Sequence, residues 1–179
     1  MTRLTRVVVI GSESTGKTIL TDRLASHFGV LWTPEFVRGY AEQKGAPIVD
    51  SDQWPIAVGQ MAAQDEAEVR ARAAGHQLLL HDTDLVSTVV YGHHYHGQCL
   101  PAIEEEARRR LANQYLLLDI DVPWVPDPVR DRGYRRQELH ALFEGTLRLF
   151  RAPFTVIRGS WDDRFSLART VIESALGMV

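Results

Sequence analysis

A glycine-rich pattern near the N-terminus lies between a strand-like run and a helix-like run, and this arrangement limits the folds that the chain can adopt. The run Val7–Ile10 is continuously apolar, as in a strand buried on both faces of a parallel sheet. The next residues, Gly11–Thr18, read G-S-E-S-T-G-K-T, and from Lys17 to Phe28 apolar residues recur at helical spacing. Strand, glycine-rich turn and helix together match the P-loop pattern G-x-x-x-x-G-K-S/T, for which this context is required.

The residue types of this loop suit a nucleoside triphosphate and a magnesium ion. Glycines let the backbone turn its N–H groups inward around phosphate, and the following helix adds the partial positive charge of its N-terminus. We expect Lys17 to reach the β- and γ-phosphates of ATP and the Thr18 hydroxyl to bind Mg²⁺. The predicted ATP-binding residues of the loop are Gly11, Ser12, Glu13, Ser14, Thr15, Gly16, Lys17 and Thr18.

Apolar runs of strand length alternate with helical segments along the rest of the chain. Further strands are predicted at 30–33, 78–80, 115–118 and 154–157, and further helices at 53–74, from 85, from 101 to about 112, up to 150 and at 165–176. Five strands separated by helices predict a three-layer α/β fold, with helices on both faces of a mostly parallel sheet. No repeat or linker divides the sequence, so we expect residues 1–179 to form a single domain.

A second carboxylate for magnesium is expected at the end of another buried strand. The run Leu78–Leu80 leads to Asp82, which is therefore the candidate metal ligand besides Thr18. Asp84 has two open interpretations. It either caps the helix that begins at Leu85 or faces the phosphate acceptor as a catalytic base.

Candidate acceptor-binding residues follow the second strand, at the carboxyl edge of the sheet where open α/β folds bind ligands. Glu35 is a candidate general base or hydroxyl-binding group, and Arg38 a candidate acceptor ligand. The alternative for this pair is a surface ion pair. The rings of Trp32, Trp54 and Trp124 are candidates either to stack on a planar base or to pack in the core, and Trp54 is included in the predicted acceptor site.

An arginine-rich segment at about 124–136 follows the fourth strand and is predicted to be a lid. It contains Arg130, Arg132, Arg135 and Arg136, with prolines and a glycine around them. Guanidinium groups that close over a transferring phosphoryl group would neutralise its charge, so Arg130, Arg132 and Arg136 are candidate catalytic residues. The alternative is a solvated helix start in which the arginines pair with neighbouring acidic residues.

Two other groups of residues have less specific patterns. Gly159 and Trp161 follow the last predicted strand, where P-loop kinases commonly hold the adenine, and both are candidate ATP-binding residues; packing is the alternative for Trp161. Among His93, His94 and His96, only the first and third share a helical face, so surface or helix-end positions are favoured over a metal site.

Composition excludes some classes of function. A net charge of -3 argues against a protein built around nucleic-acid binding. No apolar run approaches the length of a membrane span or a signal-peptide core, and the single cysteine, Cys99, excludes an internal disulfide and fits a reducing compartment. We therefore expect a cytoplasmic protein with ATP and a nucleoside-like small molecule as partners, no membrane and no nucleic acid. The sequence leaves a homodimer open.

Five segments in this order resemble those of one family. They are the P-loop G-S-E-S-T-G-K-T, Glu35–Arg38, Asp82–Asp84, the arginine-rich stretch that begins with Trp124–Asp127, and Asp163–Phe165. Together they resemble the AAA_28-type P-loop ATPases, and within them the ribosylnicotinamide kinase domain of NadR proteins. The resemblance covers essentially the whole chain.

The resemblance implies a P-loop NTPase fold of the nucleoside and nucleotide kinase type, with strand order 2-3-1-4-5. It also implies transfer of the ATP γ-phosphate to the 5′-hydroxyl of nicotinamide riboside, giving nicotinamide mononucleotide, with Mg²⁺ as the second cofactor. The sequence is too short for the adenylyltransferase and DNA-binding domains of the multifunctional members, so those activities are not implied. Pro34 stands where those members tend to have an aromatic residue, so Trp32 or Trp54 would have to replace that ring.

Two alternatives to this function are kept. The first is another nucleoside, deoxynucleoside or nucleotide kinase on the same scaffold. The second is a regulatory P-loop ATPase that works as a switch and has no small-molecule acceptor. The acidic balance disfavours a nucleic-acid kinase.

Overall fold

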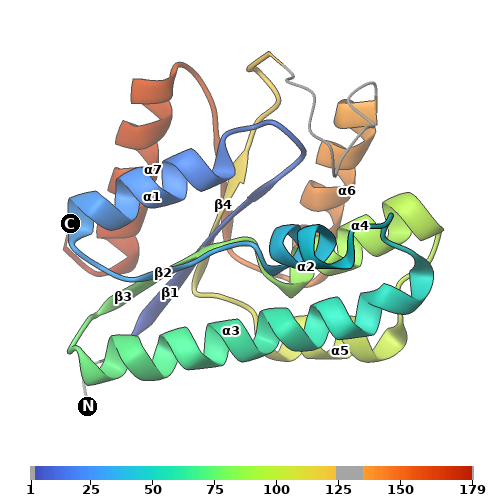
Figure 1. Cartoon of the computed structure of the whole chain (residues 1–179). Helices are drawn as coiled ribbons and strands as arrows, with labels where there is room; N and C mark the ends of the chain where they lie inside the picture. The colour runs from blue at the N-terminus through green and yellow to red at the C-terminus, as the bar shows by residue number, and fades with distance from the viewer. Residues whose placement is uncertain (1–2, 124–134, 179) are drawn as a thin grey trace.

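A parallel β-sheet forms the centre of the computed structural model, which describes residues 3–123 and 135–178 (Figure 1). Its strands are β1 (Thr5–Gly11), β2 (Trp32–Thr33), β3 (Leu78–Asp82), β4 (Gln114–Leu118) and β5 (Phe154–Ile157). In the described part of the chain the sheet has the order β2-β3-β1-β4-β5, and neighbouring strands are parallel. The predicted five-stranded parallel sheet and its 2-3-1-4-5 order are confirmed.

Helices cover both faces of this sheet (Figure 1). They are α1 (Lys17–Phe28), α2 (Phe36–Lys44), α3 (Gln53–Ala73), α4 (Leu85–His96), α5 (Pro101–Arg109), α6 (Arg136–Leu149) and α7 (Trp161–Ala175), with a short 3₁₀ turn, η1 (Asp50–Asp52), before α3. Within residues 3–123 and 135–178, none of these helices combines the length and the apolar composition needed to cross a membrane.

The central strand β1 explains the three layers. Its side chains point alternately to the two faces of the sheet. Val7 and Val9 join the core beneath α1 and α7, whereas Val8 and Ile10 join the core formed with α3, α4, α5 and α6. All four side chains are at most 1% exposed, which is why the run is apolar without alternation.

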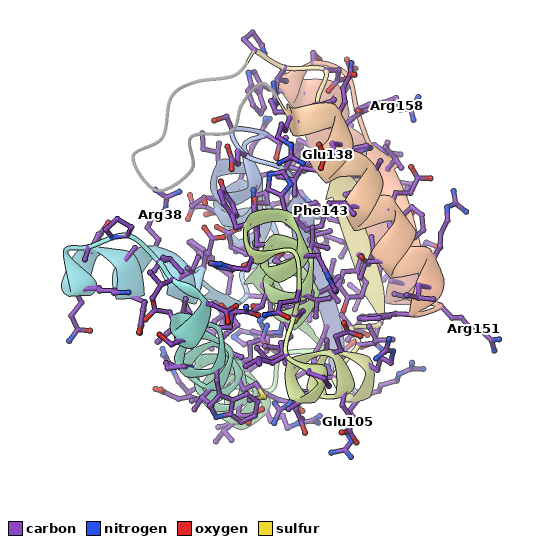
Figure 2. All side chains as sticks on the ribbon, turned by 90° about the vertical axis from the view of Figure 1, so that its right-hand side faces the viewer. Arg38, Glu105, Glu138, Phe143, Arg151 and Arg158 are labelled. Atoms are coloured by element: carbon purple, nitrogen blue, oxygen red, sulfur yellow. The ribbon has the colours of Figure 1, made fainter. Side chains whose placement is uncertain are left out.

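Phe143 shows how α6 is anchored to the second of these cores (Figure 2). Its side chain is fully buried, and its ring meets that of Tyr91 on α4 edge to face, with centroids 5.7 Å apart. Buried aromatic pairs in this geometry stabilise a core beyond their buried area alone. Helix α6 is thereby held over β1, with its first residue, Arg136, directed to the carboxyl edge of the sheet.

Two helices begin where the apolar pattern did not predict them. Helix α7 starts at Trp161, four residues before the predicted start, because Ser160 and Asp163 form a reciprocal capping box that holds the first turn. Helix α2 was not predicted at all. Phe36, Val37, Tyr40 and Ala41 do recur at helical spacing, but the helix is only nine residues long and none of its residues is fully buried, so the pattern is weak.

Two other boundaries also differ from the prediction, and the residue before α3 has another role than a cap. Strand β2 is limited to Trp32–Thr33, and α5 ends at Arg109 rather than near 112. Asp52 occupies the N-cap position of α3 but makes no side-chain cap bond there. Its carboxylate instead accepts bonds from the Val49 N–H, at 2.7 Å, and the Tyr40 hydroxyl, at 2.8 Å, and so ties α2 to the start of α3.

Candidate functional site

The P-loop connects β1 to α1 at the carboxyl edge of the sheet, in the strand–turn–helix context that the sequence predicts. The Lys17 ammonium donates to the Ser12 carbonyl at 2.8 Å, and the Thr15 hydroxyl donates to the same carbonyl at 2.9 Å. The Lys17 side chain therefore folds back over the loop, and the residue is only 6% exposed. This places its charge where the phosphates of a bound nucleotide are expected.

Both glycines of the pattern are required by their neighbours as well as by their backbone angles. Gly11 has φ of +147°, and a Cβ atom there would lie 2.9 Å from the Leu118 carbonyl oxygen. Gly16 has φ of +84°, and a Cβ atom there would lie 2.5 Å from the ring of Trp161. Any side chain at either position would meet both backbone strain and a collision.

Thr18 and Asp82 meet at the predicted metal site. The Thr18 hydroxyl donates to Asp82 Oδ2 at 2.5 Å, because the parallel register places Asp82 beside Val9, just before the loop. In the described part of the chain no three acidic, histidine or cysteine side chains gather as a metal site. Mg²⁺ is commonly bound by one or two protein oxygens, substrate phosphates and water, so these two oxygens fit a nucleotide-bound magnesium ion.

Asp84 is the N-cap of α4, which confirms the capping interpretation. One carboxylate oxygen accepts from the Val86 N–H at 2.9 Å, and the other accepts from the Tyr115 hydroxyl at 2.6 Å. Burial raises the pKa of Asp84 to about 6, against the opposing effect of these hydrogen bonds. Its role as a catalytic base stays a prediction, and both of its oxygens already accept a bond.

Glu35 and Arg38 lie at the start of α2, at the carboxyl end of β2. Glu35 is the half-buried N-cap residue of α2, and Arg38 is exposed and extends from the upper side of that helix in Figure 2. The ring of Phe36 fixes the helix on α3, because it occupies the space that a Cβ of Gly59 would take, 2.0 Å away. Both predicted acceptor residues are thus at the expected edge of the sheet, and their roles stay predictions.

The predicted tryptophans differ in position. Trp54 is 42% exposed in the first turn of α3, so its ring is accessible, while Trp32 in β2 is partly buried against the core. Trp124 lies outside the described residues, as do Arg130, Arg132 and most of the predicted lid. The stacking of Trp54 on the acceptor stays a prediction.

Arg136 is the part of the predicted lid that the structure places near the P-loop. Its Nη1 donates to the Val122 carbonyl at 2.9 Å, while its Nε and Nη2 are buried without a hydrogen-bond partner among the described residues. Burial lowers the pKa of Arg136, as does the charge of Arg164, while Glu13 in the loop and Asp121 act in the opposite direction.

Sequence reasoning missed a hydrogen bond between the P-loop and α4. The Tyr95 hydroxyl donates to Glu13 Oε1 at 2.7 Å, and the Glu13 carboxylate is almost completely buried. The two residues are 82 positions apart, and nothing in the local pattern around Tyr95 points to the loop. This bond holds the Glu13 side chain against α4.

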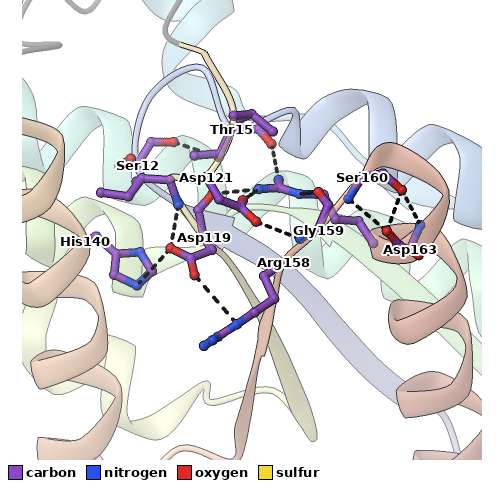
Figure 3. A network of polar contacts seen from close by, with 12 residues as sticks. Ser12, Thr15, Asp119, Asp121, His140, Arg158, Gly159, Ser160 and Asp163 are labelled. Atoms are coloured by element: carbon purple, nitrogen blue, oxygen red, sulfur yellow. Dashed lines mark hydrogen bonds and ion pairs between the residues drawn. The ribbon is translucent and has the colours of Figure 1, made fainter.

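Sequence reasoning also missed the role of Arg164, which the resemblance includes only as part of a short motif. This α7 residue is 1% exposed. Its guanidinium donates to the carbonyls of Thr15 at 3.0 Å, Asp119 at 2.9 Å and Gly159 at 3.1 Å, and forms an ion pair with Asp121 (Figure 3). One buried side chain thus connects the P-loop, the end of β4 and the turn before α7.

Gly159 and Trp161 lie beside the P-loop, as the adenine prediction requires. The Gly159 N–H donates to Asp121 Oδ2 at 2.6 Å, and the Trp161 ring, 50% exposed, contacts Gly16. A small hollow here is lined by Ile19, Leu20, Arg23, Leu118, Trp161 and Arg164. Trp161 therefore packs on the loop and also presents part of its ring, and its contact with adenine stays a prediction.

The family to which the chain belongs is shown by a direct match. The family model AAA_28, described as an AAA domain, matches residues 6–164. The chain belongs to this family.

Two curated relatives are both called trifunctional NAD biosynthesis/regulator protein NadR. The one from Salmonella typhimurium is 25% identical to this chain over 180 residues, and the one from Escherichia coli strain K12 is 27% identical over 178 residues. Each match covers 96% of this chain and 42% of the relative, so the chain spans less than half the length of either protein.

Solved structures support the same fold. A NadR protein in complex with NR has a TM-score of 0.79 at 22% identity, over 97% of this chain and 52% of that one. Thymidylate kinase from Ehrlichia chaffeensis has a TM-score of 0.66 at 12% identity, over 96% and 98% of the two chains. Deoxyadenosine kinase from M. mycoides has a TM-score of 0.60 at 10% identity, over 95% of this chain and 100% of that one. The chain has the P-loop fold that NadR and nucleotide kinases share.

Removal of the Lys17 ammonium should weaken nucleotide binding without loss of the fold. We expect Lys17→Ala to raise the dissociation constant of Mg·ADP by roughly a hundredfold, because a charged hydrogen bond to phosphate is lost. Lys44→Ala is the matched control, since Lys44 is the only other lysine and pairs with Asp52, away from the loop. Calorimetric titration with circular dichroism measures both variants. Wild-type affinity in Lys17→Ala would refute the assignment of the loop.

The burial of Asp84 should make the stability of the protein depend on pH. The folded state holds the Asp84 proton up to about pH 6, whereas the unfolded chain releases it near 3.8. This contribution to stability is complete below the lower value and is lost as pH rises through the higher one. We expect the free energy of unfolding of the wild type, relative to Asp84→Asn, to fall by about 2 kcal/mol between pH 4.5 and pH 7.5.

Urea unfolding at both pH values measures this difference. Asp22→Asn, at an exposed position of α1, is the control and should follow the wild-type curve. Parallel pH dependences for the wild type and Asp84→Asn would show that Asp84 does not titrate in this range.

Proposed function

We propose that the protein is an ATP- and Mg²⁺-dependent kinase that phosphorylates the 5′-hydroxyl of nicotinamide riboside. The observation that carries this proposal is the Thr18–Asp82 pair at the mouth of a complete P-loop, on a fold that matches a NadR protein in complex with NR. Kinship with NadR proteins, which are named for NAD biosynthesis, supports the choice of acceptor. The product would be nicotinamide mononucleotide.

On the donor side, the loop residues bind the phosphates of ATP. Backbone N–H groups of the loop and the Lys17 ammonium hold the β- and γ-phosphates, and Thr18 and Asp82 hold Mg²⁺ directly or through water. When bound, Mg²⁺ would neutralise part of the negative charge of the phosphates. Arg136, which interacts electrostatically with Glu13 of the loop, would add a further cation to neutralise the transferring phosphoryl group.

On the acceptor side, Glu35 is the better of the two candidate bases. Asp84 uses both carboxylate oxygens to cap α4 and to bind Tyr115. Glu35 is half-buried at the N-cap position of α2 and lies at the edge of the sheet where ligands bind. Glu35 would orient the 5′-hydroxyl and accept its proton, with Arg38 and Trp54 as contacts to the rest of the acceptor.

A second candidate acceptor class follows from the other structural neighbours. Thymidylate kinase and deoxyadenosine kinase share the fold over nearly the whole of this chain. A deoxynucleoside or nucleoside monophosphate is therefore the alternative acceptor. The donor side of the mechanism is the same in both cases.

A panel of acceptors decides between these two functions. With ATP and Mg²⁺, we expect ADP release above the acceptor-free rate with nicotinamide riboside and none with thymidine, deoxyadenosine or thymidylate. Product identity is checked by mass spectrometry. Turnover with a deoxynucleoside and none with nicotinamide riboside would replace the proposed acceptor, and acceptor-independent hydrolysis alone would favour a regulatory ATPase.

The role of Glu35 is tested with the preferred acceptor of that panel. We expect Glu35→Gln to lower kcat by about 10²–10⁴-fold, the usual contribution of a general base, and to leave the Mg·ADP dissociation constant unchanged. Glu42→Gln, at an exposed position on the same helix, is the matched control and should keep wild-type kcat. A wild-type kcat in Glu35→Gln would leave Asp84 as the candidate base.

A further inference from the structure

We propose that Arg164 is a positioning residue of the P-loop, which fixes the direction of the Gly16 N–H toward the bound phosphates. The inference rests on nucleotide binding by the loop, which is part of the proposed function, and is independent of the acceptor. Arg164 lies on α7, 149 positions after Thr15, its contact in the loop. It is not among the residues expected to bind ATP.

The peptide group between Thr15 and Gly16 is held from outside the P-loop. Arg164 Nη1 donates to the Thr15 carbonyl at 3.0 Å. The peptide between Thr15 and Gly16 is trans, and in a planar trans peptide the C=O and the N–H point in opposite directions. A bond that holds the Thr15 carbonyl toward α7 therefore turns the Gly16 N–H away from α7, toward the interior of the loop.

Gly16 needs such an outside restraint. Glycine adopts positive and negative φ about equally, so the Thr15–Gly16 peptide has little preference of its own between two opposite orientations. The ring of Trp161 lies directly against Gly16 and limits the space on that side. Packing alone does not orient a carbonyl, whereas the guanidinium of Arg164 binds it.

Arg164 is itself held from two other segments, so it is a fixed reference for the loop. Its Nη2 donates to the Asp119 carbonyl at 2.9 Å and pairs with the Asp121 carboxylate, while its Nε donates to the Gly159 carbonyl at 3.1 Å. Asp121 is in turn held by the Gly159 N–H at 2.6 Å (Figure 3). Through Arg164, the segments that follow β4 and β5 hold the loop peptide in one orientation.

A side chain that only filled the core would not need several directed hydrogen bonds. Four N–H groups of this guanidinium meet acceptors in three segments, and the residue is 1% exposed, so water cannot replace them. Lysine would keep the charge but present a single ammonium, which cannot reach Thr15 and Asp121 in the same geometry. Arg164→Lys therefore separates the charge from the positioning.

The test compares ligands with and without phosphates. We expect Arg164→Lys to raise the dissociation constant of Mg·ADP by roughly ten- to a hundredfold and to leave that of adenosine unchanged, because only phosphates use the loop N–H groups. Arg169→Lys is the matched control on the same helix, where Arg169 is 43% exposed and pairs with Glu173. Calorimetry measures both ligands, and thermal unfolding reports the fold of each variant.

A spectroscopic readout addresses the peptide directly. In ¹H–¹⁵N spectra, we expect one Gly16 amide signal in the wild type and in Arg169→Lys, and a broadened or doubled signal in Arg164→Lys. Equal ADP affinities in the two lysine variants would overturn the proposal. So would a parallel loss of ADP and adenosine binding, or loss of the fold in both Arg164→Lys and Arg164→Gln, since Arg164 would then be a residue of the core.

These outcomes are distinct from failure of the proposed acceptor. ADP and adenosine binding are measured without any acceptor, so the result stands whether or not nicotinamide riboside is phosphorylated. Failure of the wild type to bind Mg·ADP would refute the donor side of the proposed function and this inference together.

Discussion

The parallel register of β1 with β3 and β4 is the constraint on which the site depends. It places Asp82 beside Val9 and Leu118 beside Gly11, so that three strands end at one edge of the sheet. The P-loop leaves β1 at this edge, and α1 brings Thr18 to within 2.5 Å of Asp82. A shift of one residue in the β1–β3 register would turn Asp82 to the opposite face and separate the two oxygens.

The shape of the P-loop comes largely from residues outside its motif. Glycines allow the loop to turn, but they do not choose between orientations of its peptides. Contacts with Leu118 and Trp161 limit the space around the glycines, and the bond from Arg164 orients the Thr15–Gly16 peptide; all three residues lie more than a hundred positions later in the chain. The motif thus supplies the capacity to bind phosphate, and the fold around it supplies the preorganisation.

This division explains what the sequence could predict. Strands, the P-loop and Asp82 are marked by short-range patterns: continuous apolar runs, glycine spacing and a carboxylate at the end of a strand. Helix α2 is short and its apolar face is only half-buried, and the start of α7 depends on a capping box rather than on periodicity. Arg164 could not be assigned a role because its partners are brought together only by the folded sheet, and a buried arginine has no local sequence signature.

The two halves of the site differ in how firmly they are built. The donor half is made from β1, β3 and the buried contacts of the P-loop. The proposed acceptor half includes α2, which has no fully buried residue and is held mainly by the ring of Phe36 against Gly59 and by the bonds of Asp52 to Tyr40 and Lys44. Few core contacts depend on α2, so its residues can change with little cost to the sheet. A P-loop scaffold of this kind can therefore change the contacts of its proposed acceptor half while the donor half stays the same.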